Sequence, residues 1–264
     1  MSKTVDKNSS VNYSIITEVP GDRITEEAMR MLDTRYGLAY TRCANKDLLE
    51  LGCGPGLGLS YLAKRARNVV GGDRNPAVLS DALTKQKITL PLLCLDAQSL
   101  PFADHSFDIV LLYEAIYYLA SPDEFLCECR RILRPEGQLI ITLPNKSWPG
   151  FNPSPFSTRY FSANELYELF LAHKFRIEVY GGFPSEASTL SQKFVQLIRR
   201  FAVRAHLIPK TFKGKEKLKR IFYGSLKTIS NEFTDSHLKM DPLTVIPKGQ
   251  VKPEFRVLYA IATA

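Results

Sequence analysis

A short glycine-rich segment that follows an acidic residue carries the clearest chemical signal in the chain. Glu50 stands two residues before Gly52, which is followed at alternate positions by Gly54 and Gly56. Glycines let a strand turn sharply into a helix and let the backbone approach a ligand closely. The spacing fits neither the G-x-G-x-x-G dinucleotide fingerprint nor the GxxxxGK[ST] phosphate loop. Because a carboxylate at Glu50 would repel a pyrophosphate, the pattern favours a ligand that carries positive charge.

Acidic residues also end the next predicted strands. Asp73, followed by Arg74, lies about twenty residues beyond the glycine segment. Asp96 and Ala97 follow the next apolar run, and Glu114 ends the one after it. A carboxylate at the position of Asp73 can accept hydrogen bonds from both hydroxyls of a ribose, or it can cap the helix that follows.

The cysteines and histidines predict no metal site. The chain has five cysteines, an odd count without paired spacing, which does not make a disulfide framework. Cys127 and Cys129 fall on a predicted helix, where residues two apart point to different faces. The four histidines are scattered along the chain without ligand spacing.

The elements that must position these residues are strands alternating with helices. We predict strands at 47–53, 68–73, 90–96, 106–114, 138–144, 175–183 and 253–264. We predict helices at 22–43 with a break at Gly37, at 56–67, from Asn75-Pro76 onward, at 121–133 and, opened by a Ser162/Glu165 capping box, at 162–173. This alternation indicates an α/β doubly wound parallel sheet, whose ligands bind at the carboxyl ends of the strands.

The overall composition excludes several other classes of protein. Apolar residues make up 45% and charged residues 23% of 264 residues, which argues against disorder, collagen or a coiled coil as a global description. No apolar run approaches the ~20 residues of a membrane helix, and the N-terminus has no signal-peptide core. We therefore expect a flexible tail over residues 1–21 and a cytoplasmic protein.

Taken in order, the motifs resemble those of class I S-adenosylmethionine-dependent methyltransferases, in their small-molecule, type 11-like branch. The segment LLELGCGPGLG resembles that family's first motif, and LPFADHSFDIVLLYEAIYYL resembles its L-P-F-x-D-x-S-F-D stretch. RILRPEGQLIIT resembles the R-V-L-K-P-G-G motif with Glu136 in place of the first glycine, and we interpret it as a structural turn. The resemblance covers about 22–183 and the last strand. It implies a Rossmann-like sheet of seven strands, mostly parallel, with an antiparallel strand at the C-terminus.

The resemblance also implies a cofactor, S-adenosylmethionine, and residues that bind it. Among them, Glu50 fixes the ammonium end, Asp73 the ribose hydroxyls and Asp96 the adenine amino group, while the glycine loop packs against the methionine part. The full set implied is Glu50, Gly52, Gly54, Gly56, Asp73, Arg74, Asp96, Ala97 and Glu114.

The chemistry of methyl transfer demands few side chains. It is an in-line displacement that needs a positioned acceptor, the exclusion of water and in some enzymes the removal of a proton. Tyr117 and Tyr118 stand where many relatives carry a pair of histidines. Tyr118 is our candidate catalytic residue, as a group that orients the acceptor, because a tyrosine with a pKa of ~10 is a poor base. Packing in the pocket wall is the alternative for both, and Tyr36 could close over the cofactor or merely pack.

Two segments outside the motifs are candidates for the acceptor side. The long loop 145–162 holds the single tryptophan, Trp148, and we interpret it as a wall of the acceptor pocket. The other is an insertion at 186–250 between the last two strands. The stretch 191–227 has eleven Lys/Arg and one Glu, whereas the rest of the chain has 24 basic and 26 acidic residues. Apolar residues recur with helical spacing over 190–208, which predicts a helical insertion.

This basic insertion leaves three interpretations open. It packs on the core as a helical cap with a solvated charged face, it contacts an anionic membrane or a phosphate-bearing acceptor through 190–227, or it binds RNA. The absence of interleaved stacking aromatics argues against nucleic acid. A membrane contact would place the protein on the inner face of the membrane.

The function predicted from the sequence is S-adenosylmethionine-dependent methyl transfer to a small-molecule or envelope-precursor acceptor. One alternative is an RNA methyltransferase, suggested by the basic segment. Another is a protein that binds the cofactor without catalysis, because in-line transfer requires no diagnostic catalytic residue.

Overall fold

The computed structural model describes residues 19–84, 88–185, 226–230 and 240–264. Its strands are β1 (Arg23–Ile24), β2 (Asp47–Leu51), β3 (Asn68–Asp73), β4 (Leu92–Cys94), β5 (Phe107–Tyr113), β6 (Leu133–Pro144), β7 (Arg176–Pro184), β8 (Lys227–Thr228), β9 (Thr244–Val245) and β10 (Phe255–Thr263). Its helices are α1 (Glu26–Tyr40), α2 (Leu59–Leu62), α3 (Pro76–Thr84), η2 (Ile116–Tyr118), α4 (Pro122–Ile132) and α5 (Ala163–Ala172).

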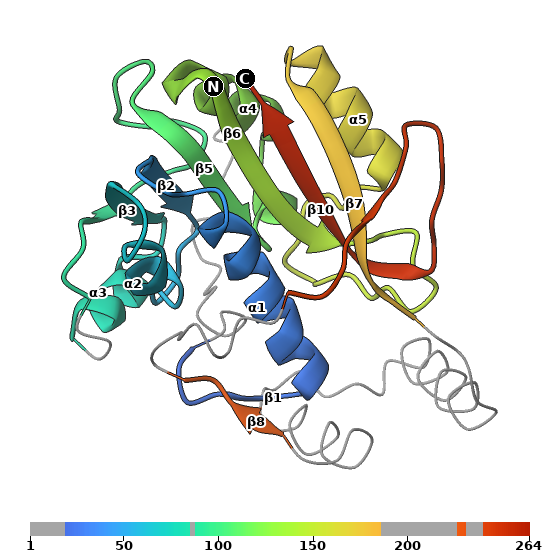
Figure 1. The fold of residues 1–264 in the computed structure, drawn as a ribbon, viewed down its shortest axis with the longest axis horizontal. Helices are drawn as coiled ribbons and strands as arrows, with labels where there is room; N and C mark the ends of the chain where they lie inside the picture. Colours follow the sequence, from blue (N-terminus) through green and yellow to red (C-terminus); the bar gives the residue numbers. More distant parts are fainter. Residues whose placement is uncertain (1–18, 85–87, 186–225, 231–239) are drawn as a thin grey trace, which may run out of the picture.

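The main sheet has eight strands in the order β4-β3-β2-β5-β6-β10-β7-β9 (Figure 1). The first five are parallel, and β10 runs antiparallel to both β6 and β7. We call the edge at which the parallel strands end the carboxyl edge, and the opposite one the amino edge. The chain winds outward from β2 to β4 and then from β5 to β7, so the strand order reverses between β2 and β5. The predicted doubly wound α/β fold is confirmed, and the switch point between β2 and β5 marks the expected place for a ligand.

The predicted seven strands become eight because β9 joins the outer edge. Tyr180 and Gly181 of β7 pair with Val245 and Thr244 of β9. The next residue, Ile246, is fully buried, and its N–H donates to the Val179 carbonyl at 2.8 Å. A two-residue strand has too little periodic pattern to stand out in a sequence.

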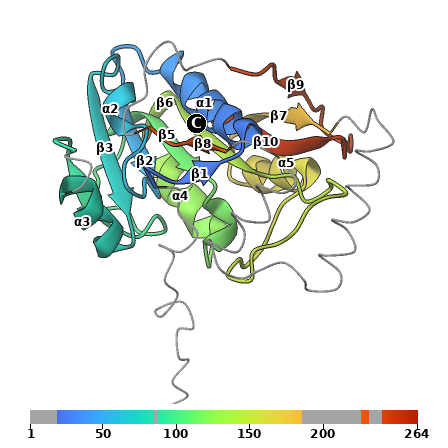
Figure 2. The same ribbon diagram turned by 90° about the horizontal axis from the view of Figure 1, so that it is seen from below.

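Helices cover both faces of the sheet, with α1 and α2 on one face and α4 and α5 on the other (Figures 1 and 2). Each face has its own apolar core. Leu32 of α1 and Leu62 of α2 are buried with Leu48 and Leu111 of the central strands. Phe125 of α4 is buried in the other core. The alternation of side chains along the central strands supplies both cores, as expected for a sheet that is covered on each side.

Two predicted helices are shorter than expected. Instead of 22–43, α1 spans Glu26–Tyr40, and it runs through Gly37 without a break, with the Thr41 N–H bonded to the Gly37 carbonyl at 3.0 Å. Instead of 56–67, α2 is one turn long. The Arg67 N–H donates to the Lys46 carbonyl at 2.9 Å, so the chain must leave the helical path early to begin β3 beside β2.

The RPEG segment lies inside β6, at the amino edge. Phe107 pairs with Leu133 and Ile109 with Gln138, so residues 134–137 form an excursion between two stretches of the same ladder. Glu136 there has a φ of 62°, in the left-handed region that favours glycine. This agrees with our interpretation of the segment as a turn in which Glu136 replaces a glycine.

The described parts of the insertion are extended rather than helical. At residues 226–230, β8 pairs antiparallel with β1, and the Gly21 N–H donates to the Ile229 carbonyl at 3.0 Å. At 240–250, Asp241 forms an ion pair with Arg30 of α1 at 2.9 Å. Both pieces therefore pack against the body formed by the sheet and its helices, which corrects the helical insertion predicted over 186–250 at residues 226–230 and 240–250. The expected tail at 1–18 and the predicted helix at 190–208 lie outside the described residues.

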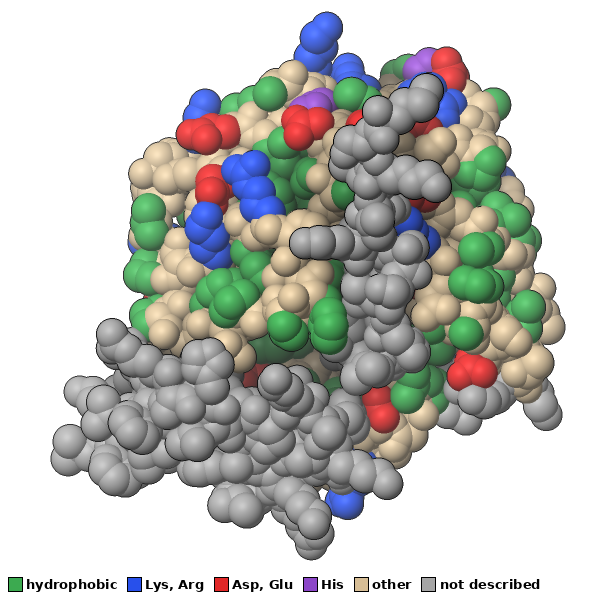
Figure 3. All heavy atoms as spheres, turned by 180° about the vertical axis from the view of Figure 1, so that it is seen from behind, with side chains coloured by type: hydrophobic (Ala, Val, Ile, Leu, Met, Phe, Trp, Pro, Cys, Tyr) green, Lys and Arg blue, Asp and Glu red, His purple; other side chains and the backbone are tan. Residues whose placement is uncertain are grey.

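Charge is evenly mixed on the face that carries α4 and α5. Figure 3 shows acidic and basic side chains interspersed over the described part of this face, without a patch of either sign. Most of the basic stretch 191–227 lies outside the described residues, and its contact with an anionic membrane stays a prediction. In the part of the chain that the structure describes, no helix is long and apolar enough to cross a membrane.

Candidate active site

The glycine segment forms a tight turn at the carboxyl end of β2. Gly52, Gly54 and Gly56 have φ values of 64°, 54° and 78°, which only glycine adopts without strain. A Cβ on Gly52 would lie 3.3 Å from the Ala115 Cβ, so the turn lies directly beside the end of β5. The sequence places glycines here because the chain must reverse from strand to helix in left-handed conformations at the switch point.

Glu50 lies beneath this turn and is almost completely buried, with 2% of its surface exposed. The Tyr36 hydroxyl of α1 donates to Glu50 Oε1 at 2.9 Å. The other carboxylate oxygen, Oε2, is buried and has no hydrogen-bond partner in the described structure. Burial raises the pKa of Glu50 to about 7. A charged partner for Oε2 would offset the free energy that burial of the ionised carboxylate costs, so the site suits a cation or a strong hydrogen-bond donor.

Asp73 connects the glycine turn to the end of β3. Its Oδ2 accepts the Gly54 N–H at 2.9 Å and its Oδ1 the Asn75 N–H at 2.8 Å. Burial raises the pKa of Asp73. The carboxylate therefore shapes the turn and caps the entry to α3. Each of its oxygens has a second lone pair that can accept a ligand hydroxyl.

The ends of β3 and β4 lie side by side at the carboxyl edge. The Leu95 N–H donates to the Asp73 carbonyl at 3.1 Å, and exposed Arg74 approaches Asp96 with Nε and Oδ2 3.9 Å apart. Asp96 Oδ1 accepts both the N–H and the side-chain amide of Gln98, at 2.9 and 3.1 Å. The carboxylate of Asp96 is thus held in one orientation at a partly exposed position, next to partly buried Ala97.

Glu114 begins the opposite wall of the site, after β5. Its φ of 52° is strained for a residue with a side chain, and strain of this kind gathers at functional sites. The buried Tyr117 hydroxyl donates to Glu114 Oε2 at 3.0 Å. Tyr118 is only partly buried, and burial raises its pKa to about 12. Tyr118 therefore keeps its proton at neutral pH, which excludes a ready general base and leaves a hydrogen-bond donor.

Loop 145–162 packs against this wall. The Thr158 N–H donates to the Tyr117 carbonyl at 2.8 Å, and the Thr158 hydroxyl to the Leu119 carbonyl at 2.7 Å. The rings of Tyr117 and Tyr160 stack with their centroids 4.5 Å apart, and Phe151 meets Tyr160 edge-on at 4.7 Å. The packing interpretation holds for Tyr117, while the role of Tyr118 stays a prediction.

The structure brings the predicted cofactor residues to one edge and adds partners that the sequence did not show. Tyr36 packs against Gly58, where an added Cβ would lie 1.9 Å from the ring, and its hydroxyl donates to Glu50. That Tyr36 closes over the cofactor stays a prediction. Thr158 was missed because its contacts with Tyr117 and Leu119 span about forty residues and leave no local pattern. Gln98 lies only two residues from Asp96, but no sequence motif singled it out. Among the described residues, no group of three or more His, Cys, Asp or Glu side chains is placed to hold a metal ion.

A doubly wound sheet with a glycine turn and acids at its switch point defines a nucleotide-cofactor-binding α/β protein, and the comparisons narrow this class. Residues 49–141 match the family model of a methyltransferase domain. A probable S-adenosylmethionine-dependent methyltransferase of Mycolicibacterium smegmatis is 35% identical over 61% of this chain and 63% of its own. A phthiotriol/phenolphthiotriol dimycocerosates methyltransferase of Mycobacterium ulcerans is 34% identical over 52% of this chain and 54% of its own.

A solved structure supports the fold. An S-adenosylmethionine-dependent methyltransferase from Archaeoglobus fulgidus superposes with a TM-score of 0.54 over 90% of this chain and 94% of that one, at 18% identity. The chain spans between half and two thirds of the lengths of the two curated relatives. Residues 49–141 therefore match a methyltransferase domain of the class I, type 11 kind, and the relatives that share it are named as S-adenosylmethionine-dependent, so the cofactor of this domain is S-adenosylmethionine.

The residues present fit that cofactor. The buried Oε2 of Glu50 lacks a partner, and an ammonium group would supply one. The left-handed glycines leave the turn without side chains where a ligand must approach the backbone. Asp73 and Asp96 lie at the ends of adjacent strands, as acceptors for the hydroxyls and the amino group of an adenosine.

Proposed function

We propose that this protein transfers a methyl group from S-adenosylmethionine to a small-molecule or envelope-precursor acceptor at the carboxyl edge of the sheet. The observation that carries the proposal is the buried carboxylate of Glu50, which has one oxygen without a partner and lies two residues before the glycine turn. A buried acid in this state is costly unless a ligand completes it. The matched methyltransferase domain at 49–141 includes this residue.

The side chains of the site have few chemical tasks in this reaction. Bound there, the cofactor supplies an electrophilic methyl group on a sulfonium sulfur. Glu50 and Asp73 would hold the cofactor on either side of its sulfonium sulfur, at the ammonium group and at the ribose, so that the methyl group has a fixed direction. Tyr118, protonated at neutral pH, orients the acceptor as a hydrogen-bond donor from the wall after β5. An in-line displacement of this kind needs orientation more than acid–base chemistry.

The acceptor side is the aromatic wall formed by η2 and loop 145–162. Tyr117, Tyr118, Phe151 and Tyr160 line up there through ring contacts. Such a wall suits an acceptor with an apolar part beside the reacting group. The Mycobacterium ulcerans relative, named for phthiotriol dimycocerosates, supports an acceptor other than nucleic acid. No observation in the described residues favours RNA or a non-catalytic role.

A transfer assay tests this function. The full chain is incubated with S-adenosylmethionine labelled on its methyl group and with separate pools of envelope precursors, small apolar alcohols and acids, and bulk RNA. We expect label in an apolar small-molecule fraction and none in RNA. Label in RNA alone would contradict the acceptor class. Cofactor binding without transfer to any pool would instead support a non-catalytic cofactor-binding protein.

A further inference from the structure

The segment between β4 and β5 is held in place by residues that do not belong to the predicted cofactor set. It begins with Asp96 and Ala97 at the carboxyl edge and runs to Ser106 at the start of β5. Only its first residues belong to the predicted cofactor set. The rest is irregular, so it has no strand or helix of its own to fix its path. Its conformation must therefore be imposed by a neighbour, and that neighbour is α4.

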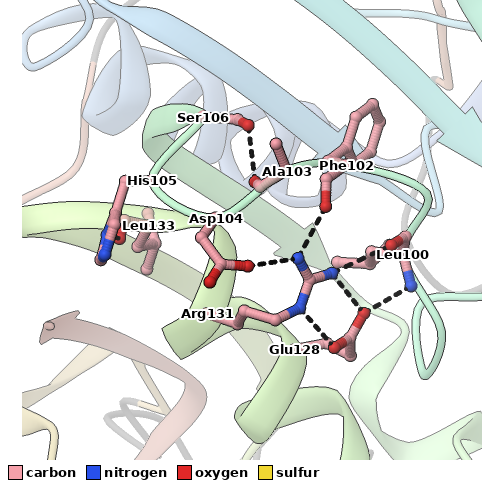
Figure 4. A network of polar contacts seen from close by, with 9 residues as sticks. All are labelled: Leu100, Phe102, Ala103, Asp104, His105, Ser106, Glu128, Arg131 and Leu133. Atoms are coloured by element: carbon pink, nitrogen blue, oxygen red, sulfur yellow. Dashed lines mark hydrogen bonds and ion pairs between the residues drawn. The ribbon is translucent and has the colours of Figure 1, made fainter.

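Arg131 of α4 makes most of the contacts between this helix and the segment (Figure 4). Its Nη2 donates to the Leu100 carbonyl at 3.0 Å and its Nη1 to the Phe102 carbonyl at 2.6 Å. Nη1 also donates to Asp104 Oδ1 at 2.9 Å. The guanidinium thus binds three points within five consecutive residues of the segment.

Glu128, one turn before Arg131, completes the arrangement. Arg131 Nε and Nη2 donate to the two oxygens of Glu128, each at 2.8 Å. Glu128 Oε2 also accepts the Leu100 N–H at 2.7 Å. The two helix side chains thereby hold both backbone groups of Leu100, and Arg131 uses each of its five N–H donors. Lysine, with three donors on a single nitrogen, cannot reproduce this fork.

A second contact ties the start of the segment to the same helix. Gln98 Oε1 accepts the N–H of Ser121, the N-cap of α4, at 2.5 Å. The same side chain donates through its amide nitrogen to Asp96 Oδ1 at 3.1 Å. Asp96 is thus fixed from behind by Gln98, and the chain that leads away from it is fixed by Arg131 and Glu128.

We propose that Arg131, together with Glu128, is a positioning residue for the adenine end of the cofactor site, because it holds the 96–106 segment in the conformation that presents Asp96 and the Ala97 amide to the base. Arg131 does not touch the base itself. Its effect passes through the segment, so it governs cofactor affinity and the preference for adenine over other bases. This inference rests on the proposed function, since it takes the ligand of this edge to be an adenosine.

The test compares two ligands in matched variants. S-adenosylhomocysteine and S-inosylhomocysteine differ only at the base, where a carbonyl replaces the amino group from which Asp96 would accept a hydrogen bond. Arg131→Lys keeps the charge but loses the fork. The control is Arg134→Lys, because the Arg134 side chain is 33% exposed against 32% for Arg131 and also forms ion pairs, with Asp47 and Asp108 at the amino edge. Affinities are measured by calorimetry beside the melting temperature of each protein.

We expect Arg131→Lys to weaken binding of S-adenosylhomocysteine roughly tenfold, the scale of lost hydrogen bonds to a charged group. Its preference for the adenine ligand should shrink severalfold, while Arg134→Lys keeps the affinity and the preference of the natural protein. In an Asp96→Asn background, Arg131→Lys should no longer change the preference, since both changes act on one contact. Should Arg131→Lys fail to fold, Glu128→Gln, which retains an acceptor for the Leu100 N–H, should give the same pattern more weakly.

Two results would overturn the inference, and they can be told apart. If Arg131→Lys and Glu128→Gln only lower the melting temperature and leave affinity and preference as in Arg134→Lys, the cluster is structural support and no more. If the natural protein binds neither ligand, the proposed function fails, and the inference fails with it.

Discussion

Strand β2 carries an acidic residue near each of its ends, and the two acids have opposite surroundings. At the amino edge, Arg67 donates two hydrogen bonds to Asp47, at 2.8 and 2.6 Å, and Arg134 lies 2.9 Å away. At the carboxyl edge, three residues later, Glu50 accepts a single bond from Tyr36. One end of the strand is fully paired and the other is left with a buried oxygen that has no partner.

The pKa values of the two carboxyl groups separate accordingly. The hydrogen bond from Arg67 holds the pKa of Asp47 well below its usual range. Burial raises the pKa of Glu50 to about 7. Asp47 therefore stabilises the folded chain above its unfolded pKa and loses that effect as pH falls. Glu50 does the reverse, because its ionisation in the folded protein costs free energy as pH rises through 7.

The difference between Asp47 and Glu50 distinguishes a carboxylate that stabilises the fold from one that is available to bind a ligand. A carboxylate whose charge is matched by arginines is complete without a ligand. A buried carboxylate with an unpartnered oxygen lowers the stability of the free protein, so a binding role accounts for its presence. The arginine pairs at the amino edge thus hold the strands together, and the carboxyl edge is where we propose that the cofactor binds.

Glu50→Gln should have the largest effect on cofactor affinity, and it tests the difference between the two acids most strongly. The variant should bind S-adenosylmethionine about 10–100-fold more weakly, since a hydrogen bond to a charged partner contributes roughly 1.5–3 kcal/mol. At pH 8 it should also be more stable than the natural protein, by on the order of 1–3 kcal/mol, because the buried charge is gone. Calorimetry and chemical denaturation at pH 8 measure the two quantities. A less stable variant with unchanged affinity would make Glu50 a structural acid.

Asp47→Asn should give the opposite pair of results. Arg67 and Arg134 lose a charged partner, so the free energy of unfolding should fall by about 1–2 kcal/mol at pH 7, kept modest because Arg67 is half exposed. Cofactor affinity should not change. Denaturation curves at several pH values should show the deficit shrinking as pH falls from the unfolded pKa of Asp47 toward its lowered folded pKa. A loss of affinity with stability intact would erase the distinction between the two edges.

Cofactor binding should release protons near neutral pH. An ammonium group beside Glu50 lowers its pKa from about 7, so binding near neutral pH should expel a fraction of a proton. Titrations in buffers of different ionisation enthalpy measure this number. The Glu50→Gln variant should lack this release. Equal release in both proteins would assign the proton to another group.

The smallest effect concerns Tyr118. Tyr118→Phe should lower turnover by a few fold without changing cofactor affinity, because one neutral hydrogen bond contributes about 0.5–1.5 kcal/mol. Tyr180→Phe is a matched control, since its hydroxyl donates to Glu178 on the distant strand β7 at 3.0 Å. Steady-state kinetics with a confirmed acceptor separate the two. Equal turnover in both variants would leave Tyr118 as a packing residue.

The sequence predicted the sheet and the residues at its carboxyl edge because both depend on patterns of neighbouring residues. Apolar runs ending in glycine or an acid mark the central strands, and Ser162 and Glu165 form the predicted capping box. Asn75-Pro76 and Ser121-Pro122 stand where α3 and α4 begin. These signals depend on a few neighbouring residues, so no knowledge of the fold is needed to see them.

Contacts between residues far apart in the chain could not be predicted from the sequence. The hydrogen bond between Tyr36 and Glu50 links helix α1 to the central strand β2. Strand β8 pairs with β1, which lies more than two hundred residues earlier in the chain. Glu128 and Arg131 have the i, i+3 spacing of a helix pair, which was visible, but nothing local showed that they hold Leu100. Asp73 was assigned to the ribose, and its bond to the Gly54 N–H adds a second role in shaping the turn.

The central claim is that the carboxyl edge binds S-adenosylmethionine, and calorimetry on the Asp73→Ala variant tests it most directly. Titrated with the cofactor, the natural protein should bind one molecule. Asp73→Ala should keep its fold and lose roughly 1–3 kcal/mol of binding free energy, because the ribose hydroxyls lose their acceptor and the glycine turn loses the bond to the Gly54 N–H. Unchanged affinity in a folded Asp73→Ala protein would contradict the assignment of this edge as the cofactor site.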